Sequence, residues 1–377
     1  MTEPAITFIA FEEYPKKGVI YEYIDHAGKK FSEVAVICAT DGDEDLEETH
    51  NGVHVHRVHV KTLKKMSLEA IRFTNKARRL YRRTQKDHHP CLVHVFSYVG
   101  CRALRHGSPE GKWVYHTRSG AIKSTLIHKI SKPLQVIDAR GYDAIFTNAE
   151  DIVGRMEGKV FVVSPMGVNM DRFRPEAGDQ CVWNEYGIPS GSSVLIYHGR
   201  LDPSRKIETL IEAFNEVHTV QPRTSLILMG EDPNVVRLKE VAERLGVSES
   251  VYFIGRIDYP EVPSYLAASD LGLAYIPITI EYDKQPPLKT LEYLSCGLPV
   301  VATGTEGNKG FVEDGQNGVI AGDSSSEYAE AVLKVLSVDG LREKIAGKAR
   351  ESVKPYDWQR LMENRFFPAY DELLSDL

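Results

Sequence analysis

Residues 286–302 read PPLKTLEYLSCGLPVVA, and this stretch decides the fold. Pro287 suits the first position of a helix, where a missing N–H costs nothing, and Gly297 suits the position just past a helix end. The apolar run LPVVA that follows is typical of a buried strand. The stretch therefore predicts a helix of about two to three turns followed by a core strand.

One cation and one carboxylate share a face of this predicted helix. Lys289 and Glu292 are three residues apart, so both lie near its N-terminus. The free N–H groups there favour a phosphate, with Lys289 as an additional charge. Glu292, one turn deeper, could accept hydrogen bonds from a ribose diol. The alternative is an ordinary surface ion pair on a capped helix.

A second stretch, SVLIYHGRLDPSRKIETLIEAF at 193–214, combines a strand, a polar loop and an amphipathic helix. The loop carries Arg200, Arg205 and Lys206. Open α/β sheets bind ligands where a strand ends and a helix begins, and three cations there suit a diphosphate. A solvated basic loop is the alternative.

Strand-like and helix-like segments alternate between these two stretches. The expected strands are 225–229, 251–254 and 271–276, and the expected helices are 235–245 and 262–268. Alternating units of this length predict a mostly parallel sheet covered on both faces. All the motifs then lie at one edge of one Rossmann-like domain.

These residues resemble the retaining glycosyltransferases of family 4. The resemblance covers about half of the chain and rests on HGR at 198–200, the pair at 205–206, LILMGEDP at 226–233, VYFIGRI at 251–257, LEYLSCGLPVVAT at 291–303 and EDGQNGVI at 313–320. It implies an α/β protein of GT-B architecture, in which two Rossmann-like parallel-sheet domains face each other across a cleft.

The resemblance also implies residue roles. Arg200 and either Arg205 or Lys206 are expected to bind the donor diphosphate, and Glu292 the nucleotide ribose. Gly199 and Leu288 complete the expected donor-binding set.

The sequence departs from the family pattern at one position. Most members carry a glutamate eight positions before the ribose ligand, where this chain has Lys284. The segment is more similar to a sub-group with the pattern Pro-x-Lys-x-x-Glu/Gln-Tyr, in which the lysine contacts the diphosphate. This favours Lys289 as a catalytic residue together with Arg200.

The N-terminal half predicts a second parallel α/β domain. Expected strands lie at 5–10, 34–39, 53–60, 92–96, 112–115 and 144–147. Gly18, in the loop after the first of them, either lets a ligand approach the backbone or simply forms a turn. His116 follows a strand near the position of a family histidine close to the donor sugar, and we assign it a catalytic role against a structural alternative.

The length of 377 residues suits two domains. We expect an acceptor-side domain at 1–170 and a nucleotide-sugar-binding domain at 171–356. The resemblance to the family implies that segment 161–174 is the crossing between them and that a C-terminal helix at 357–377 packs back on the first domain. The sequence shows no transmembrane or secretory segment, and five scattered cysteines indicate neither a disulfide framework nor a zinc site, so a reducing cytoplasm is the expected setting.

Positive charge is concentrated in one segment. Residues 57–89 carry eleven Lys/Arg and two carboxylates, a net charge of +9 in a chain of net charge −7. Apolar residues spaced three and four apart at 63–80 predict a helix with an apolar stripe and a cationic back. The stripe is expected to pack on a sheet; alternatively, basic helix 62–86 lies on the inner face of an anionic membrane. Nucleic acid is not an expected partner, because no aromatic stacking surface accompanies the cations.

The resemblance implies the activity of a retaining hexosyltransferase. It would transfer a sugar from a UDP- or GDP-sugar to a hydroxyl of a glycan or lipid-linked acceptor, with no metal and no cofactor beyond the donor. The alternatives are a catalytically silent GT-B partner or regulatory protein, and a nucleotide-sugar epimerase or phosphorylase on a similar fold.

Overall fold

The computed structural model of the chain divides into two compact units. Unit 1 comprises residues 1–165 and 358–377, and unit 2 comprises residues 166–357. The structure describes residues 4–15, 18–61, 68–84, 92–107, 111–117, 134–147, 160–163, 166–231 and 235–375. Each unit is built on its own sheet.

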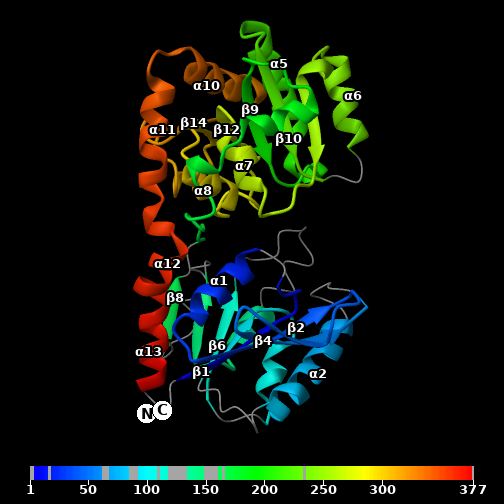
Figure 1. Cartoon of the computed structure of the whole chain (residues 1–377), viewed down its shortest axis with the longest axis vertical. Coiled ribbons are helices and arrows are strands. Elements are labelled where there is room, and N and C mark those ends of the chain that lie inside the picture. The colour runs from blue at the N-terminus through cyan, green and yellow to red at the C-terminus, as the bar shows by residue number, and fades with distance from the viewer. Residues whose placement is uncertain are drawn as a thin grey trace. The chain divides into compact units, whose positions relative to one another are not determined.

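Unit 1 contains an eight-stranded sheet in its described residues (Figure 1). Its strands are β1 (Ala5–Ala10), β2 (Glu33–Thr40), β3 (Glu47–His50), β4 (Val53–His59), β5 (Leu92–Phe96), β6 (Lys112–Thr117), β7 (Ala144–Thr147) and β8 (Val160–Val163), in the order β3-β4-β2-β1-β5-β6-β7-β8. The pairings are parallel except that β3 runs antiparallel to β4. The predicted parallel sheet is confirmed, with β3 as an unpredicted antiparallel edge.

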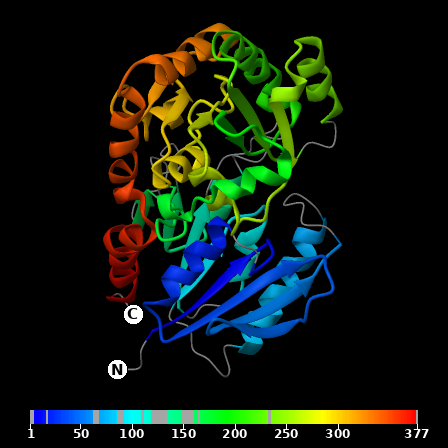
Figure 2. The same ribbon diagram turned by 45° about the horizontal axis from the view of Figure 1, so that its top comes forward.

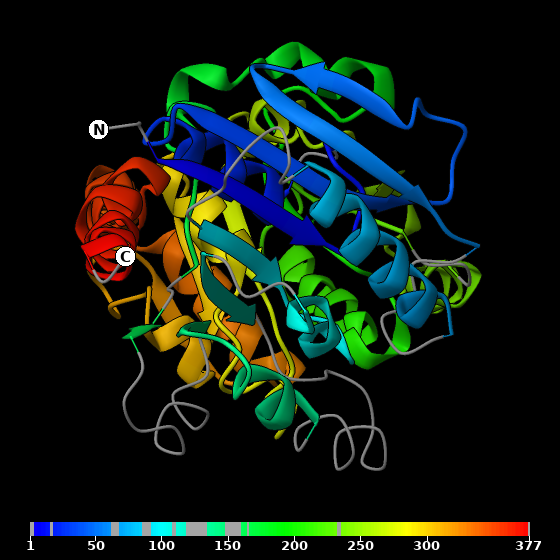
Figure 3. The same ribbon diagram turned by 90° about the horizontal axis from the view of Figure 1, so that it is seen from below.

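Helices cover both faces of this sheet and form two cores. One face packs against α1 (Val19–Gly28) and the C-terminal segment, which runs through α12 (Trp358–Leu361), a π-helical turn (Met362–Phe366) and α13 (Phe367–Ser375) (Figure 2). The other face packs against α2 (Leu68–Thr84) and a short 3₁₀ helix (Cys101–Arg105) (Figure 3).

Helix α2 carries the predicted apolar stripe. Ala70, Phe73 and Ala77 are buried against the sheet, and Leu80 is partly buried beside them. The packing of the stripe on a sheet is therefore confirmed for the described part of the basic segment. Its first residues, 62–67, and its last two, 85–86, lie outside the described residues.

Unit 2 contains a fully parallel six-stranded sheet (Figure 1). Its strands are β9 (Ser193–His198), β10 (Thr224–Met229), β11 (Val251–Gly255), β12 (Leu271–Ala274), β13 (Val300–Thr303) and β14 (Val319–Ala321). Its α-helices are α5 (Ile207–Val220), α6 (Val236–Arg244), α7 (Val262–Ala267), α8 (Leu288–Ser295), α9 (Glu306–Lys309), α10 (Ser325–Ser337) and α11 (Leu341–Ser352). The order β11-β10-β9-β12-β13-β14 reverses direction between β9 and β12, and ligands bind outside the carboxyl ends of strands at such a point.

The predicted crossing segment at 161–174 begins differently from expectation. Its first residues belong to β8, so unit 2 begins only at Met166. The apolar run FVV is a strand because it pairs with β7. Where unit 2 begins and ends, its two ends lie side by side: the Val168 N–H donates to the Tyr356 carbonyl at 2.9 Å.

Candidate functional site

Helix α8 is bracketed by the residues that predicted it. Pro287 stands just before the helix as its N-cap, with an extended ψ of 119°, rather than at its first position, which Leu288 takes with a half-buried side chain. Gly297 lies past the end with a φ of +71°, a conformation that glycine adopts without strain. The Leu298 N–H then turns back to the Tyr293 carbonyl at 3.0 Å, which closes the end as a Schellman motif.

The end of β9 and helix α8 are tied together. The His198 backbone N–H donates to the Tyr293 hydroxyl at 2.8 Å, and both the Tyr293 and Leu291 side chains are buried in the unit 2 core. The first turn of α8 therefore lies beside the loop that follows β9. This places the two stretches that the sequence singled out at one edge of the unit 2 sheet.

Lys289 is half-buried in the first turn of α8. Its Nζ lies 3.7 Å from the centroid of the Tyr197 ring, in cation–π contact. Burial and the nearby charge of Arg205 hold the pKa of Lys289 well below its usual value, against the opposing effect of Glu292. A Cβ at Gly199, whose φ is +138°, would stand 3.3 Å from the Lys289 Nζ, so glycine leaves room for the ammonium.

Arg205 and Arg200, two cations of the loop after β9, have different surroundings. The Arg205 guanidinium lies 4.3 Å from the centroid of the Tyr282 ring, and the Tyr282 hydroxyl is 2.7 Å from Ser204 Oγ. Arg200 pairs with Asp202 through Nε at 2.8 Å, with its side chain 62% exposed. Of the two residues left open by the sequence, Arg205 is thus the one near Lys289.

Lys206 has a different place from Arg205. It is exposed at the N-cap of α5, with a left-handed φ of +50°. Its position fits a role in the turn into the helix.

Glu292 is buried, with 1% of its side chain exposed. Its Oε2 is 2.6 Å from His198 Nε2, and its Oε1 accepts a hydrogen bond from the Tyr259 hydroxyl at 3.0 Å. The alternative of an exposed ion pair between Lys289 and Glu292 is wrong, because Glu292 bonds to His198 and Tyr259 inside the unit.

The unit 2 edge can hold a doubly charged anion next to a polyol. Arg205 and Lys289 supply two positive charges close enough for one to lower the pKa of the other. The free N–H groups at the N-terminus of α8 and the positive end of its dipole both favour an anion there. Glu292 is a carboxylate acceptor one turn further along the helix.

Unit 1 contains the two other predicted site residues. Gly18 precedes α1 with an extended backbone, and a Cβ there would meet nothing within 4 Å. His116 is 2% exposed, and its Nδ1 lies 3.0 Å from Nε2 of His94. Burial lowers the pKa of His94 to about 3, and its Nδ1 lies 2.8 Å from the Tyr370 hydroxyl. The structure therefore places His116 in a buried polar chain, as the structural alternative expects.

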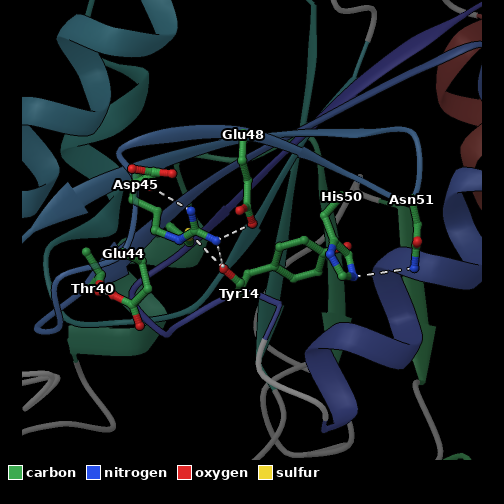
Figure 4. A network of polar contacts seen from close by, with 9 residues as sticks. Tyr14, Thr40, Glu44, Asp45, Glu48, His50 and Asn51 are labelled. Atoms are coloured by element: carbon green, nitrogen blue, oxygen red, sulfur yellow. Dashed lines mark hydrogen bonds and ion pairs between the residues drawn. The ribbon is translucent and has the colours of Figure 1, made fainter.

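Arg57 on β4 joins the loop after β1 to the β3–β4 hairpin; Figure 4 shows its partners Tyr14, Asp45 and Glu48. Only 7% exposed, it donates to the Asp45 carbonyl at 2.6 Å and to the Tyr14 carbonyl at 3.1 Å, and it pairs with Glu48. Three rings pack beside this anchor: Tyr14, Tyr21 and His50. The described part of the loop after β1, residues 11–15, is thereby held at Tyr14 by side chains from a distant part of unit 1.

Neither a metal cluster nor a membrane-spanning helix occurs in the described ranges. Among these residues, no group of three or more His, Cys, Asp or Glu side chains is arranged to hold a metal ion. None of the helices within the same ranges is long and apolar enough to cross a bilayer.

The part of the chain that forms this edge of the unit 2 sheet is similar to a known protein family. Residues 183–352 match the sequence model of the family described as glycosyl transferases group 1. The match includes the loop after β9 and the whole of α8.

Part of the chain is similar to curated proteins with named activities. D-inositol 3-phosphate glycosyltransferase 2 of Catenulispora acidiphila is 29% identical over 245 residues, which are 59% of this chain and 54% of that protein. The chain thus spans about half the length of the curated relatives it matches.

Solved structures are similar over nearly the whole chain. Sucrose-phosphate synthase from Thermosynechococcus elongatus has a TM-score of 0.81 at 17% identity, covering 99% of this chain and 100% of that one. HepE from Anabaena, solved with UDP and glucose, has a TM-score of 0.73 at 20% identity over 99% of both chains. The predicted fold class, two parallel-sheet α/β domains of the GT-B type, is confirmed.

The sequence missed the residues that arrange the charges at the unit 2 edge. They are Tyr197, His198, Tyr259 and Tyr282, of which only His198 lay in a motif quoted for the resemblance. Tyrosines have no spacing rule that marks them as partners of a distant cation or carboxylate. Lys284, where the family pattern has glutamate, is exposed in the loop before α8.

Proposed function

We propose that this chain is a retaining, metal-independent glycosyltransferase that transfers a hexosyl group from a UDP- or GDP-sugar to a hydroxyl of a glycan or lipid-linked acceptor. The observation that carries the proposal is the meeting of Arg205, Lys289 and Glu292 at the switch-point edge of the unit 2 sheet. Two cations suit a diphosphate, and a buried carboxylate suits a ribose diol.

The proposed chemistry is stabilisation of a leaving group. A nucleotide-sugar loses its diphosphate only if the developing negative charge is neutralised, and Arg205, Lys289 and the start of α8 supply positive charge in place. Arg200 is exposed, and it can reach the diphosphate by giving up its pair with Asp202. The acceptor hydroxyl would attack from the face that the diphosphate leaves, so the product keeps the donor's configuration.

Named relatives support the proposed substrate classes. One curated relative is called a D-inositol 3-phosphate glycosyltransferase, and the HepE structure contains UDP and glucose. We infer for this chain a nucleotide-sugar donor and a phosphorylated or lipid-linked sugar acceptor.

The surface of α2 supports contact with an anionic membrane as part of this function. Leu68 and Ile71 are 73% and 57% exposed at the start of the helix, and Arg72, Lys76 and Arg79 are exposed beside them. Apolar side chains among cations suit insertion at a lipid headgroup layer. A cytoplasmic enzyme that meets a lipid-linked acceptor there would use this surface.

The test begins with a thermal-shift titration with UDP, GDP and ADP, in magnesium and in EDTA, for wild type and Glu292→Ala. We expect selective stabilisation by one nucleotide that EDTA does not change and the variant weakens. Turnover of the matching nucleotide-sugar should fall at least about tenfold in both Arg200→Ala and Lys289→Ala, roughly 1.4 kcal/mol of transition-state binding each. Near-normal rates in both variants would contradict the proposal.

The exposed Lys284 favours a second candidate, a catalytically silent GT-B partner protein. A carboxylate that family members place near the donor sugar is absent at this position. A silent protein would bind nucleotide weakly or not at all and would give no sugar-dependent turnover. The same titration separates the two candidates.

A further inference from the structure

Both oxygens of the Glu292 carboxylate are occupied inside unit 2. Oε2 faces His198 Nε2 at 2.6 Å, and Oε1 accepts from the Tyr259 hydroxyl at 3.0 Å. Only 1% of the side chain is exposed. A ligand diol can therefore reach the carboxylate only if one of these two partners moves away.

His198 is the fixed partner. It is the last residue of β9, and its backbone N–H is held by the Tyr293 hydroxyl of α8. Its ring also packs edge to face on the Tyr293 ring of α8, with 5.8 Å between centroids, so displacing it would break a contact between the strand and the helix that carries Glu292 itself.

Tyr259 is the partner that can leave. It is half-buried in the loop between β11 and α7. Its ring packs 5.5 Å from the Phe173 ring and 5.6 Å from the Arg172 guanidinium, measured from centroids. These contacts support the ring and do not involve Glu292, so the hydroxyl can give up its bond while the ring keeps neighbours.

We propose that the Tyr259 hydroxyl occupies the place of a ribose hydroxyl on Glu292 and is displaced when a nucleotide binds. Tyr259 is then a specificity-determining residue of the donor site, an inference that rests on the proposed function. In the free protein it satisfies Oε1 of Glu292, an oxygen that would otherwise be buried without its donor, which is costly. Any ligand must match this hydrogen bond, so a nucleotide without ribose hydroxyls gains nothing by displacing Tyr259.

The proposal predicts that removing the hydroxyl tightens binding. In Tyr259→Phe, the ribonucleotide no longer competes with an internal hydrogen bond, and its Kd should fall about tenfold, roughly 1.4 kcal/mol. A 2′,3′-dideoxynucleoside diphosphate of the same base should bind wild type and Tyr259→Phe equally. In a double-mutant cycle with Glu292→Ala the gain should disappear, because the competition acts through that carboxylate.

The measurement is calorimetric titration of the full chain with UDP, GDP or ADP, whichever binds wild type, and with its dideoxy counterpart. Tyr265→Phe is the matched control, since the Tyr265 hydroxyl donates to a different carboxylate, Glu185, at 3.3 Å. The control should leave both affinities unchanged. Circular dichroism and melting of each variant establish that it is folded.

The outcomes separate the inference from the function on which it rests. If wild type binds a nucleotide but Tyr259→Phe binds it equally or more weakly, the exchange of hydroxyls is wrong while the nucleotide site stands. An equal gain for ribose and dideoxyribose ligands also overturns it, because the effect would then be unrelated to the diol. If no variant binds any nucleotide, both the function and this inference fail.

Discussion

Lys289 combines a cationic role with surroundings that disfavour its charge. Its ammonium is half-buried over the Tyr197 ring, and after burial the charge of Arg205 contributes most to lowering its pKa. Two cations brought together without an anion raise the free energy of the empty site. The proposed diphosphate would offset both penalties with its own negative charge, as expected of a site for an anionic ligand.

Proton uptake on binding is the expected consequence. The pKa of Lys289 lies well below its usual value in the free protein, and a diphosphate beside it would raise that pKa. Between the lowered and the raised pKa the lysine is neutral when free and charged in the complex, so binding takes up a proton and weakens as pH rises through this window. Titration calorimetry in buffers of different ionisation enthalpy measures the uptake.

Lys289→Met is the variant that isolates this effect. It should bind the diphosphate more weakly at low pH and show proton uptake reduced by up to one proton per site. Lys206→Met, at an exposed cation of the loop after β9, is the control and should leave the uptake unchanged. Equal uptake in wild type and Lys289→Met would show that another group titrates.

The principal charged residues of the site could be predicted from the sequence because their signal is local. Lys289 and Glu292 share one helix turn, and Arg205 lies in a loop next to a strand end. Tyr259 and Tyr282 could not be found in this way, because tertiary packing brings them to Glu292 and Arg205 from other loops. The burial of His116 could not be predicted either, because the sequence around a histidine near a strand end is the same whether it lies in a core or in a cleft.

The β3–β4 hairpin acts as a brace for the loop after β1. Arg57 reaches from β4 to carbonyls of both Asp45 and Tyr14, so one side chain joins the hairpin to the loop (Figure 4). Since Arg57 is 7% exposed and pairs with Glu48, the interaction is shielded from salt.

Arg57→Met should loosen this brace. The change removes hydrogen bonds from two backbone carbonyls and leaves Glu48 without its partner, and we expect a loss of about 2–4 kcal/mol in the free energy of unfolding of unit 1. Hydrogen exchange should accelerate at residues 11–15 and 41–48. Arg72→Met removes an ion pair with Glu69 on the surface of α2 and should cost less than about 1 kcal/mol. Equal stability losses in the two variants would argue against a bracing role for Arg57.

Most strands could be predicted because their residues form apolar runs. The strand β3, with the sequence EETH, has no such run and is exposed on an edge, so only its pairing with β4 reveals it. The strand β14 has three residues, too few for a periodic signal. The apolar residues of β8 fall within the segment that resembles the family's crossing, and so short a run has no periodic signal that marks it as a strand of unit 1.

Unit 2 is formed by one continuous segment of the chain, whereas unit 1 is formed by two. The sheet of unit 1 is covered on one face by residues 358–377. This segment buries Trp358, Leu361, Phe366 and Tyr370, and the Tyr370 hydroxyl bonds to both His94 and Tyr23. Unit 1 therefore depends on a segment that follows unit 2.

Deleting residues 358–377 should unfold unit 1 selectively. The deletion exposes a sheet face lined by aromatic side chains, and the loss of even one buried phenylalanine costs about 3–5 kcal/mol. Hydrogen exchange read segment by segment should show lost protection in β1, β5 and β6 while β9, β10 and β12 keep theirs. Phe366→Ala, a graded variant at a fully buried position, should give a smaller loss confined to the same unit. Full protection of β1 in the truncated chain would contradict this dependence.

The return of residues 358–377 to unit 1 also sets an order of events during synthesis. Residues 166–357 leave the ribosome before the segment that covers the β1 sheet, so unit 2 can complete its core while unit 1 still presents an open apolar face. Domains usually mature from the N-terminus onward. Here the domain that is translated first is the last to be finished, and its nascent sheet is the surface on which a chaperone would act.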